Sequence, residues 1–218
     1  MPEPITIVGI GLGSLALTSH LARRYFGVAK EVADIVLGFL AFVLCLPVLI
    51  ACAAIIKLSS SGPVLYRQQR VGKGGRLFMM YKLRTMRTNA ESATGVVWAA
   101  RGDPRVLPAC RWMRRSHVDE LPQLINVIRG DMSLVGPRPE RPEILSQLEE
   151  TYPDIRKRLA VRPGITGLAQ VRNGYDTTIE AFRAKLAADL EYIERRNWST
   201  ELRIMAATVG KLRDRTAH

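Results

Sequence analysis

The longest apolar stretch of this chain covers residues 35–56, which contain no charged side chain. An α-helix of that length would extend about 33 Å, enough to cross the hydrocarbon core of a bilayer. Pro47 lies just past the midpoint of the stretch, where a proline removes a helix hydrogen bond and forces a kink or a break. The pattern therefore predicts a membrane helix broken at Pro47.

Basic residues flank this stretch at both ends. Three precede it and four follow it: Arg23, Arg24 and Lys30, then Lys57, Arg67, Arg70 and Lys73. Because Lys and Arg mark the cytoplasmic side of membrane helices, a straight span would put one cluster on the wrong side. The charge pattern favours a re-entrant helix that dips into the membrane and returns to the same face. A straight span and a buried helix of a soluble protein are the alternatives.

Residues 4–22 form an apolar lead-in whose glycines match the dinucleotide-binding pattern G-x-G-x-x-A at 11–16. Glu31 follows about twenty residues after the start of that match. A dinucleotide-binding unit needs a second parallel strand next, but the chain runs directly into the long apolar stretch. Nicotinamide or flavin binding is therefore disfavoured, and we expect the lead-in to be interfacial or membrane-embedded.

The rest of the chain alternates short β-prone and helical segments. Two β-prone runs lie on either side of the glycine loop 72–75 and predict a hairpin. That loop could cradle a phosphate with backbone N–H groups, but it lacks the Walker pattern and is more often a plain turn. Residues 87–108 are polar and turn-rich. Helical patterns follow at 109–116, 121–129, 144–152, 179–195 and 202–212.

Composition adds a strong positive charge to this picture. The 218 residues are 47% hydrophobic and carry a formal net charge of +12, which suits a protein resting on an anionic membrane surface. Nucleic acid is disfavoured as a partner, because only 6% of residues are aromatic and no recognition motif is present. The three cysteines have no metal-ligand spacing and imply no disulfide framework. No basic segment precedes the apolar N-terminus, so a cleaved secretory signal is not expected.

Two adjacent acids, Asp119 and Glu120, stand out as candidate chemistry. Four apolar positions follow them at helical spacing, Leu121, Leu124, Ile125 and Ile128, and predict one apolar helix face. The acids then fall at or just before the helix N-terminus, where the helix dipole and free N–H groups favour anions and phosphate. Arg114 and Arg115 precede them and could grip a phosphate. The alternative is structural, since acids at a helix start commonly cap the helix.

Four ordered motifs carry a family resemblance that covers roughly residues 28 to 212. They are YRQQRVG at 66–72, YKLRTM at 81–86, DELPQLINVIRGDMSLVGPRP at 119–139 and VRPGITGLAQV at 161–171. Together they closely resemble the bacterial sugar transferase family of monotopic phosphoglycosyl transferases. That family also uses a proline-broken re-entrant membrane helix, in agreement with the charge argument.

The resemblance implies a two-step reaction. The aspartate matching Asp119 attacks the β-phosphate of a UDP-sugar, and UMP leaves. A polyprenyl (undecaprenyl) phosphate then takes the sugar phosphate from the aspartate, which begins a surface glycan or exopolysaccharide. The glutamate matching Glu120 would help bind Mg²⁺, a hard cation that suits carboxylate and phosphate oxygens.

Further residues fall in motifs where the family needs positive charge or polar contacts near the substrate: Arg114, Lys82, Arg84, Arg138, Arg162, Gln170 and Asp189. For each of them a solvated surface role is the alternative. This chain departs from the family at His117, which raises a proton-transfer role, although a carboxylate attacking phosphorus needs no base. It departs again at Leu168, where the family often has Trp.

The sequence thus predicts a mainly α protein with a small β element, monotopic in the membrane. Its predicted parts are an apolar lead-in (1–27), a re-entrant membrane helix (28–58) and a cytosolic catalytic domain (59–218). The expected location is the bacterial inner membrane, with the catalytic domain on the cytoplasmic face. The sugar and the oligomeric state stay open, and a homodimer is allowed. The competing hypotheses are a non-enzymatic membrane adaptor with a basic lipid-binding surface and a soluble nucleotide-binding enzyme.

Overall fold

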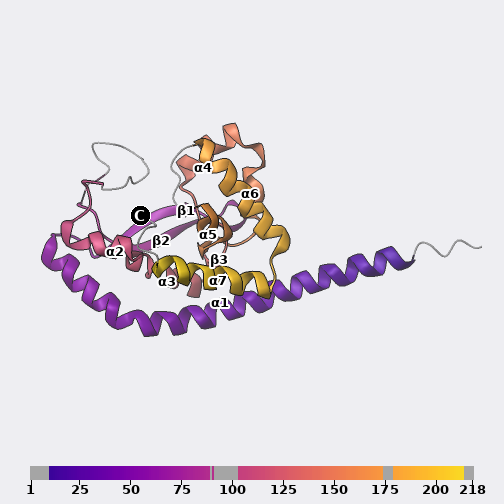
Figure 1. The fold of residues 1–218 in the computed structure, drawn as a ribbon, viewed down its shortest axis with the longest axis horizontal. Coiled ribbons are helices and arrows are strands. Elements are labelled where there is room, and N and C mark those ends of the chain that lie inside the picture. The colour runs from indigo at the N-terminus through magenta and orange to yellow at the C-terminus, as the bar shows by residue number, and fades with distance from the viewer. Residues whose placement is uncertain (1–9, 89, 91–102, 174–178, 214–218) are drawn as a thin grey trace, which may run out of the picture.

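A computed structural model gives the architecture of the chain and describes residues 10–88, 90, 103–173 and 179–213. Helices dominate it, and two small two-stranded sheets complete it. Figure 1 shows one very long helix, α1, running beneath the rest of the chain. The elements in chain order are α1 (Ile10–Ser59), β1 (Leu65–Val71), β2 (Leu77–Leu83), α2 (Arg111–Arg115), α3 (Gln123–Ile128), β3 (Ser133–Val135), α4 (Pro142–Thr151), β4 (Gly164–Thr166), α5 (Leu168–Asn173), α6 (Ile179–Arg195) and α7 (Trp198–Arg213).

Four short 3₁₀ turns connect these elements. They are η1 (Lys73–Gly75), η2 (Pro108–Cys110), η3 (Val118–Glu120) and η4 (Pro153–Ala160). The predicted hairpin is confirmed, because β1 and β2 pair antiparallel on either side of η1. The helices predicted at 144–152, 179–195 and 202–212 correspond to α4, α6 and α7. The polar segment predicted at 87–108 lies mostly outside the described residues.

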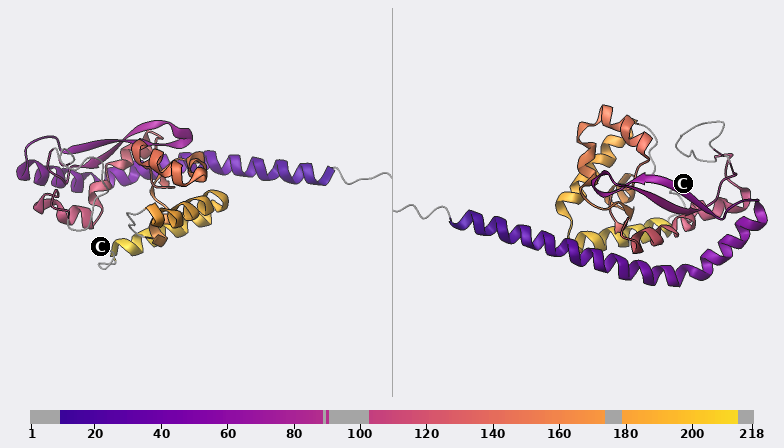
Figure 2. Two further views of the ribbon diagram at one scale, coloured as in Figure 1. Left: turned by 90° about the horizontal axis from the view of Figure 1, so that it is seen from above. Right: turned by 180° about the vertical axis from the view of Figure 1, so that it is seen from behind.

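Helix α1 is continuous from Ile10 to Ser59 and contains Pro47 in its interior. Its part from Arg24 to Ser59 is long and apolar enough to cross a membrane, and only 17% of its most apolar window is buried. Figures 1 and 2 show that α1 bends, so that its C-terminal end turns toward the hairpin. Residues 10–22, which include the glycine pattern at 11–16, are helical. Residues 4–9 lie outside the described part, and the re-entrant course stays a prediction.

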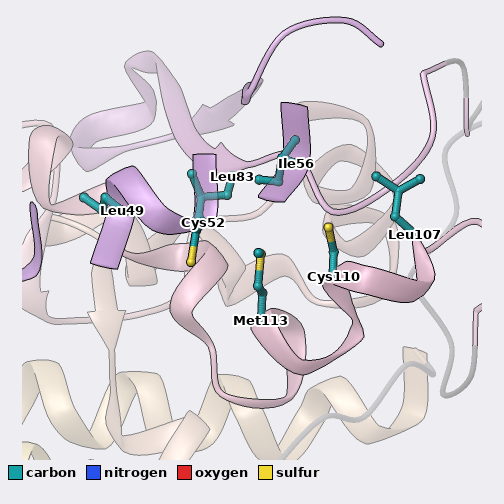
Figure 3. Packing of buried hydrophobic residues seen from close by; sticks show 7 residues of the cluster. All are labelled: Leu49, Cys52, Ile56, Leu83, Leu107, Cys110 and Met113. Carbon is teal, nitrogen blue, oxygen red and sulfur yellow. The ribbon is translucent and has the colours of Figure 1, made fainter. Parts of the chain in front are cut away.

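The C-terminal half of α1 packs onto the rest of the chain through a hydrophobic cluster. Its buried members are Leu49, Cys52, Ile56, Leu83, Leu107, Cys110 and Met113, which Figure 3 shows converging from α1, β2 and the η2–α2 segment. The thiols of Cys52 and Cys110 are buried within this apolar cluster. The cluster fixes the end of α1 against the elements that precede the acidic pair.

The predicted apolar face of the helix after the acidic pair is partly wrong. Val127 is fully buried, whereas Ile125 and Ile128 are only half-buried. Two polar side chains, Gln123 and Asn126, are also buried. The physical reason is that α3 is short and lies between α1 and β2, so neighbours cover it on two sides. Asn126 binds the β2 backbone, donating to the Met79 carbonyl at 2.7 Å and accepting from Tyr81 N at 3.1 Å.

Strands β3 and β4 pair parallel and bring two glycine-rich motifs into close backbone contact. A Cβ atom at Gly136 would lie 2.5 Å from the Arg162 carbonyl, and one at Gly164 would overlap the backbone of Gly136. Glycine is therefore required at both positions. This contact fixes the segment 136–139, which carries Arg138, beside the hairpin.

Candidate active site

The acidic pair lies in the turn η3, immediately before α3. Their position confirms the prediction that they precede a helix start. Asp119 and Glu120 are 6% and 9% exposed. The positions that cap η3 and α3 are His117 and Pro122, and neither makes a side-chain capping hydrogen bond. The two buried carboxylates therefore do not serve as the helix caps that the structural alternative required.

The turn is entered through a strained residue. His117 has φ 57° and ψ 15°, in the left-handed region that non-glycine residues rarely adopt. Glu120 N then donates to the His117 carbonyl at 3.0 Å, which closes the turn. The local chain reversal directs the Glu120 side chain toward the hairpin strand β2.

Two cations neutralise Glu120. Lys82, from β2, lies 2.7 Å from Glu120 Oε1. Arg138 donates from Nη2 to Oε1 at 2.7 Å and from Nη1 to Oε2 at 3.1 Å, a bidentate grip. Burial alone would raise the pKa of Glu120, but the charges and hydrogen bonds of Arg138 and Lys82 hold that pKa well below its usual range. Glu120 is therefore ionised at every physiological pH.

Asp119 is in the opposite situation. No described side chain donates a hydrogen bond to its carboxylate. Burial, and then the negative charge of Glu120, raise the pKa of Asp119 to about 6, against the lowering effect of Lys82, Arg114 and Arg138. One acid of the pair is thus fully paired, and the other is a desolvated carboxylate to which no described group donates a hydrogen bond.

Three cations surround the two carboxylates. Lys82 and Arg138 touch Glu120, and Arg114, from α2, is close enough to lower the pKa of Asp119. Arg114 Nη1 also donates to Thr85 Oγ1 at 3.4 Å. Among the described residues, these three cations outnumber the two ionised acids by one positive charge. The site therefore attracts an anion, and a phosphate group is a suitable one.

Arg84 belongs to the same motif as Lys82, residues 81–86, but its described hydrogen bonds lie away from the acidic pair. Its guanidinium donates to the Ser61 carbonyl at 2.5 Å and the Ser60 carbonyl at 2.9 Å, just past the end of α1. It is 5% exposed. Cations stabilise the negative end of a helix dipole, so Arg84 ties the end of α1 to β2.

The other three predicted residues also lie apart from the acidic pair. Asp189 forms a buried ion pair with Arg158, whose Nη2 also donates to the Arg138 carbonyl at 2.8 Å. It therefore supports the segment of Arg138 from behind. Arg162 pairs with Glu31 of α1 at 3.3 Å, and Gln170 Nε2 donates to the Ile165 carbonyl at 2.8 Å. No structural contact tests their predicted substrate roles.

Sequence reasoning missed a second buried group of polar residues. Lys30 lies 3.1 Å from Asp34 and 2.8 Å from Glu201, and Ser133 Oγ donates to Asp34 Oδ2 at 2.6 Å. Tyr192 OH donates to Glu201 Oε1 at 2.7 Å. We call these five residues the helix clamp, because they join α1 to β3, α6 and α7. The i, i+4 spacing of Lys30 and Asp34 next to the apolar stretch was the available signal.

The fold and the site together define the class: an enzyme with a long apolar helix and a buried acid pair among cations. The model of the bacterial sugar transferase family matches residues 25–215. The chain belongs to this family. The resemblance drawn from the four motifs is confirmed, and so is the prediction of an enzyme of the phosphoglycosyl transferase type, which answers the adaptor hypothesis.

Three curated relatives illustrate the similarity. A UDP-glucose:undecaprenyl-phosphate glucose-1-phosphate transferase of Caulobacter vibrioides is 44% identical over 194 residues, covering 88% of this chain and 72% of the relative. A UDP-N-acetylgalactosamine-undecaprenyl-phosphate N-acetylgalactosaminephosphotransferase of Aeromonas hydrophila is 42% identical, covering 82% of this chain and 42% of the relative. The exopolysaccharide production protein PSS of Rhizobium leguminosarum bv. phaseoli is 40% identical, covering 84% and 94%.

Proposed function

We propose that this chain transfers a sugar 1-phosphate from a UDP-sugar to undecaprenyl phosphate, through a covalent intermediate on Asp119. An Asp119 oxygen attacks the β-phosphorus of the UDP-sugar. The bond from that phosphorus to the bridging oxygen breaks, and UMP leaves with the electron pair. An oxygen of the lipid phosphate then attacks the same phosphorus and displaces the aspartate, which is regenerated. The product is an undecaprenyl diphosphate-linked sugar.

The contrast between the two acids carries this proposal. A carboxylate nucleophile needs an oxygen lone pair that is not occupied by a hydrogen-bond donor or a cation, and the Asp119 carboxylate has no described donor. Its pKa of about 6 leaves it ionised near neutrality and raises its basicity. Glu120 is the weaker nucleophile, because the charges and hydrogen bonds of Lys82 and Arg138 hold its pKa well below its usual range and so lower its basicity.

The cations around the pair suit the charge of the substrate. Lys82, Arg114 and Arg138 would bind phosphate oxygens of the UDP-sugar and stabilise the negative charge that develops as UMP departs. Asp189 acts at a distance in this proposal, since Arg158 links it to the backbone of Arg138. The relatives' names carry both glucose and N-acetylgalactosamine, so the proposal extends to the reaction and leaves the sugar open.

Magnesium fits this donor set as a partner of the substrate. Among the described residues no group of three or more His, Cys, Asp or Glu side chains could hold a metal alone. Mg²⁺ commonly takes only one or two carboxylates and completes its shell with water and substrate phosphates. Glu120 Oε2 accepts a single described hydrogen bond, from Arg138, and keeps a lone pair for the ion. When bound there, Mg²⁺ would neutralise diphosphate charge.

We also infer the re-entrant course of α1 and a cytoplasmic catalytic domain at the bacterial inner membrane. Both ends of the uncharged stretch 35–56 contact the same domain. Lys30 and Asp34 belong to the helix clamp, while Ile56 lies in the hydrophobic cluster with Leu83. A straight span would separate these ends by the thickness of the bilayer. The bend of α1 and the basic flanks support the same course, and the exposed apolar side chains of α1 support contact with membrane lipids.

Covalent trapping tests the reaction. The full chain in nanodiscs with Mg²⁺ is mixed with UDP-glucose or UDP-N-acetylgalactosamine, without lipid phosphate, and UMP and intact mass are measured. We expect one equivalent of UMP per enzyme and a sugar phosphate on Asp119. Asp119→Asn should give neither, whereas Asp154→Asn, at an exposed acid of η4, should behave as the wild type. UMP release by Asp119→Asn at the wild-type rate would refute the nucleophile.

Cysteine labelling tests the topology. In a cysteine-free background, Tyr25→Cys and Ser61→Cys place single thiols on the two flanks of the uncharged stretch. A membrane-impermeant maleimide should label neither site in intact spheroplasts and both sites in inside-out vesicles. Labelling of one site in spheroplasts would establish a straight span instead.

A further inference from the structure

A pocket of about 210 Å³ lies at the tip of the hairpin, away from the acidic pair. It is lined by Gly72, Lys73, Arg76, Phe78, Gly130, Asp131 and Arg162. Phe78 precedes Lys82 by four positions on β2, so the pocket lies about 13 Å along the strand from the site of Glu120. It is smaller than the pockets that enclose drug-sized ligands, which begin near 300 Å³, and suits a small group.

Three bases line this pocket against one acid. Lys73 and Arg76 are exposed at the hairpin turn, and neither has an ion-pair partner within the described part of the chain. Arg162 is held by Glu31. The single acid, Asp131, accepts a hydrogen bond from Asn126 Nδ2 of α3 at 3.4 Å. With Glu31 counted, three bases face two acids, so among the described residues the pocket keeps an excess of one positive charge.

Three amides of the glycine loop that borders this pocket donate within the turn itself. Gly72 N donates to the Arg76 carbonyl, Gly75 N to the Gly72 carbonyl and Arg76 N to the Lys73 carbonyl. The loop is thus a closed turn, as the commoner reading of its sequence expected. Its effect is to hold the side chains of Lys73 and Arg76 on one side of the pocket opposite Arg162.

The contact between the pocket and helix α1 indicates the depth of the pocket relative to the membrane. Arg162 binds Glu31, which precedes by four residues the first position of the uncharged stretch 35–56. A helix turn separates Glu31 from that stretch, about 6 Å along the axis. If the stretch enters the bilayer, the pocket lies at the depth of the phospholipid headgroups.

We propose that this pocket binds the phosphate group of an anionic phospholipid headgroup. Lys73 and Arg76 contact the phosphate from the hairpin turn, and Arg162 contacts it from the side of α1. The bound lipid fixes the depth and the rotation of α1 relative to the hairpin. The proposal does not depend on the reaction assigned to Asp119.

The number and type of lipids that the purified protein retains test this site directly. The full chain is reconstituted into nanodiscs of phosphatidylcholine with a minority of phosphatidylglycerol, released into detergent, and its bound lipids are counted by native mass spectrometry. We expect the wild type to retain one phosphatidylglycerol in preference to phosphatidylcholine. Lys73→Gln/Arg76→Gln should weaken this preference roughly thirtyfold, on the scale of two interfacial bases.

A matched variant separates the site from general charge. Arg172→Gln/Arg195→Gln removes the same number of exposed bases from α5 and α6, outside the pocket, and should retain the lipid as the wild type does. The melting temperature of Lys73→Gln/Arg76→Gln should match that of the wild type, because the side chains of Lys73 and Arg76 hold no described contact. The control loses two surface ion pairs with Glu191, each worth less than about 1 kcal/mol, so its melting temperature should fall only slightly. Equal retention by Lys73→Gln/Arg76→Gln, or equal loss by the control, overturns the proposal. Displacement of the lipid by millimolar inorganic phosphate would instead assign the pocket to a soluble phosphate and overturn the lipid assignment.

Discussion

Two buried groups of charges in this molecule follow opposite rules. In the helix clamp, Lys30 lies between two carboxylates, and Ser133 and Tyr192 donate to the same carboxylates. In the acidic pair, Glu120 has two cations while its neighbour Asp119 has no described donor. A satisfied network holds elements together, whereas a desolvated and unpaired carboxylate is costly and reactive. The difference separates a structural site from a catalytic one.

The largest effect is expected at Asp119. Asp119→Asn should lower turnover by about 10⁴-fold or more, since it removes the nucleophile, without loss of folding. At pH values above 6, the variant should have a higher melting temperature than the wild type, because it no longer buries a charge that lacks a described partner. UMP release and thermal unfolding in detergent measure the two effects. A parallel loss of melting temperature would mean that Asp119 is structural, like the clamp acids.

Substitution of Glu120 should lower the stability of the fold, whereas substitution of Asp119 should not. Glu120→Gln leaves Lys82 and Arg138 without their counter-charge, and removing one partner of a buried ion pair costs about 3–5 kcal/mol of folding free energy. Thermal or denaturant unfolding in detergent checks this cost. Glu149→Gln, at a half-exposed acid that pairs with Arg156, is the control and should cost less than about 1 kcal/mol. A stable Glu120→Gln protein would contradict the stated ion-pair geometry.

The helix clamp should affect stability but not chemistry. Glu201→Gln removes one of the two carboxylates that pair with Lys30, and Asp34 remains as the other. We therefore expect the free energy of unfolding to fall by about 2–3 kcal/mol. Turnover per folded molecule should stay within about twofold, a difference of less than 0.5 kcal/mol. Unfolding and UMP assays on the same preparation give both numbers. If turnover falls while the melting temperature holds, the clamp takes part in catalysis and the comparison fails.

The pH dependence of Asp119 has a definite sign. Because its folded pKa is about 6 and its ordinary value is 3.8, the native state holds the proton longer than the unfolded state does. Stability therefore falls as pH rises from about 4 to about 6, by at most about 3 kcal/mol. The UMP-release rate should move the other way, falling about tenfold per pH unit below 6. Melting temperatures of wild type and Asp119→Asn should diverge in that interval and stay parallel above it.

The smallest effect concerns the turn that presents the pair. Non-glycine residues in the left-handed region cost about 1 kcal/mol, and β-branched residues cost more. His117→Val should therefore be less stable than His117→Gly by about 1–2 kcal/mol, as measured by unfolding at pH 8. Equal stability of the two variants would mean that the turn relaxes to a negative φ.

Several elements were predictable because local patterns decide them. Alternating β-prone runs around a glycine loop defined the hairpin, and 3.6-residue periodicity defined α4, α6 and α7. The apolar face after the acidic pair was only partly predicted, because periodicity on a six-residue helix cannot tell which neighbours cover it. Asn126 is buried for the same reason: it binds the β2 backbone, a contact with no local signal.

The sequence by itself determined the long apolar helix, the hairpin, the position of Asp119 and Glu120 before a helix, and the family, since ordered motifs and local periodicity encode all of these. Only the tertiary structure decided which acid is neutralised. The two are adjacent in sequence and equally close to a helix start. The difference arises because Lys82 and Arg138, 38 and 18 residues away, meet Glu120 and not Asp119. Long-range packing sets the electrostatics of each carboxylate, and no local pattern records it.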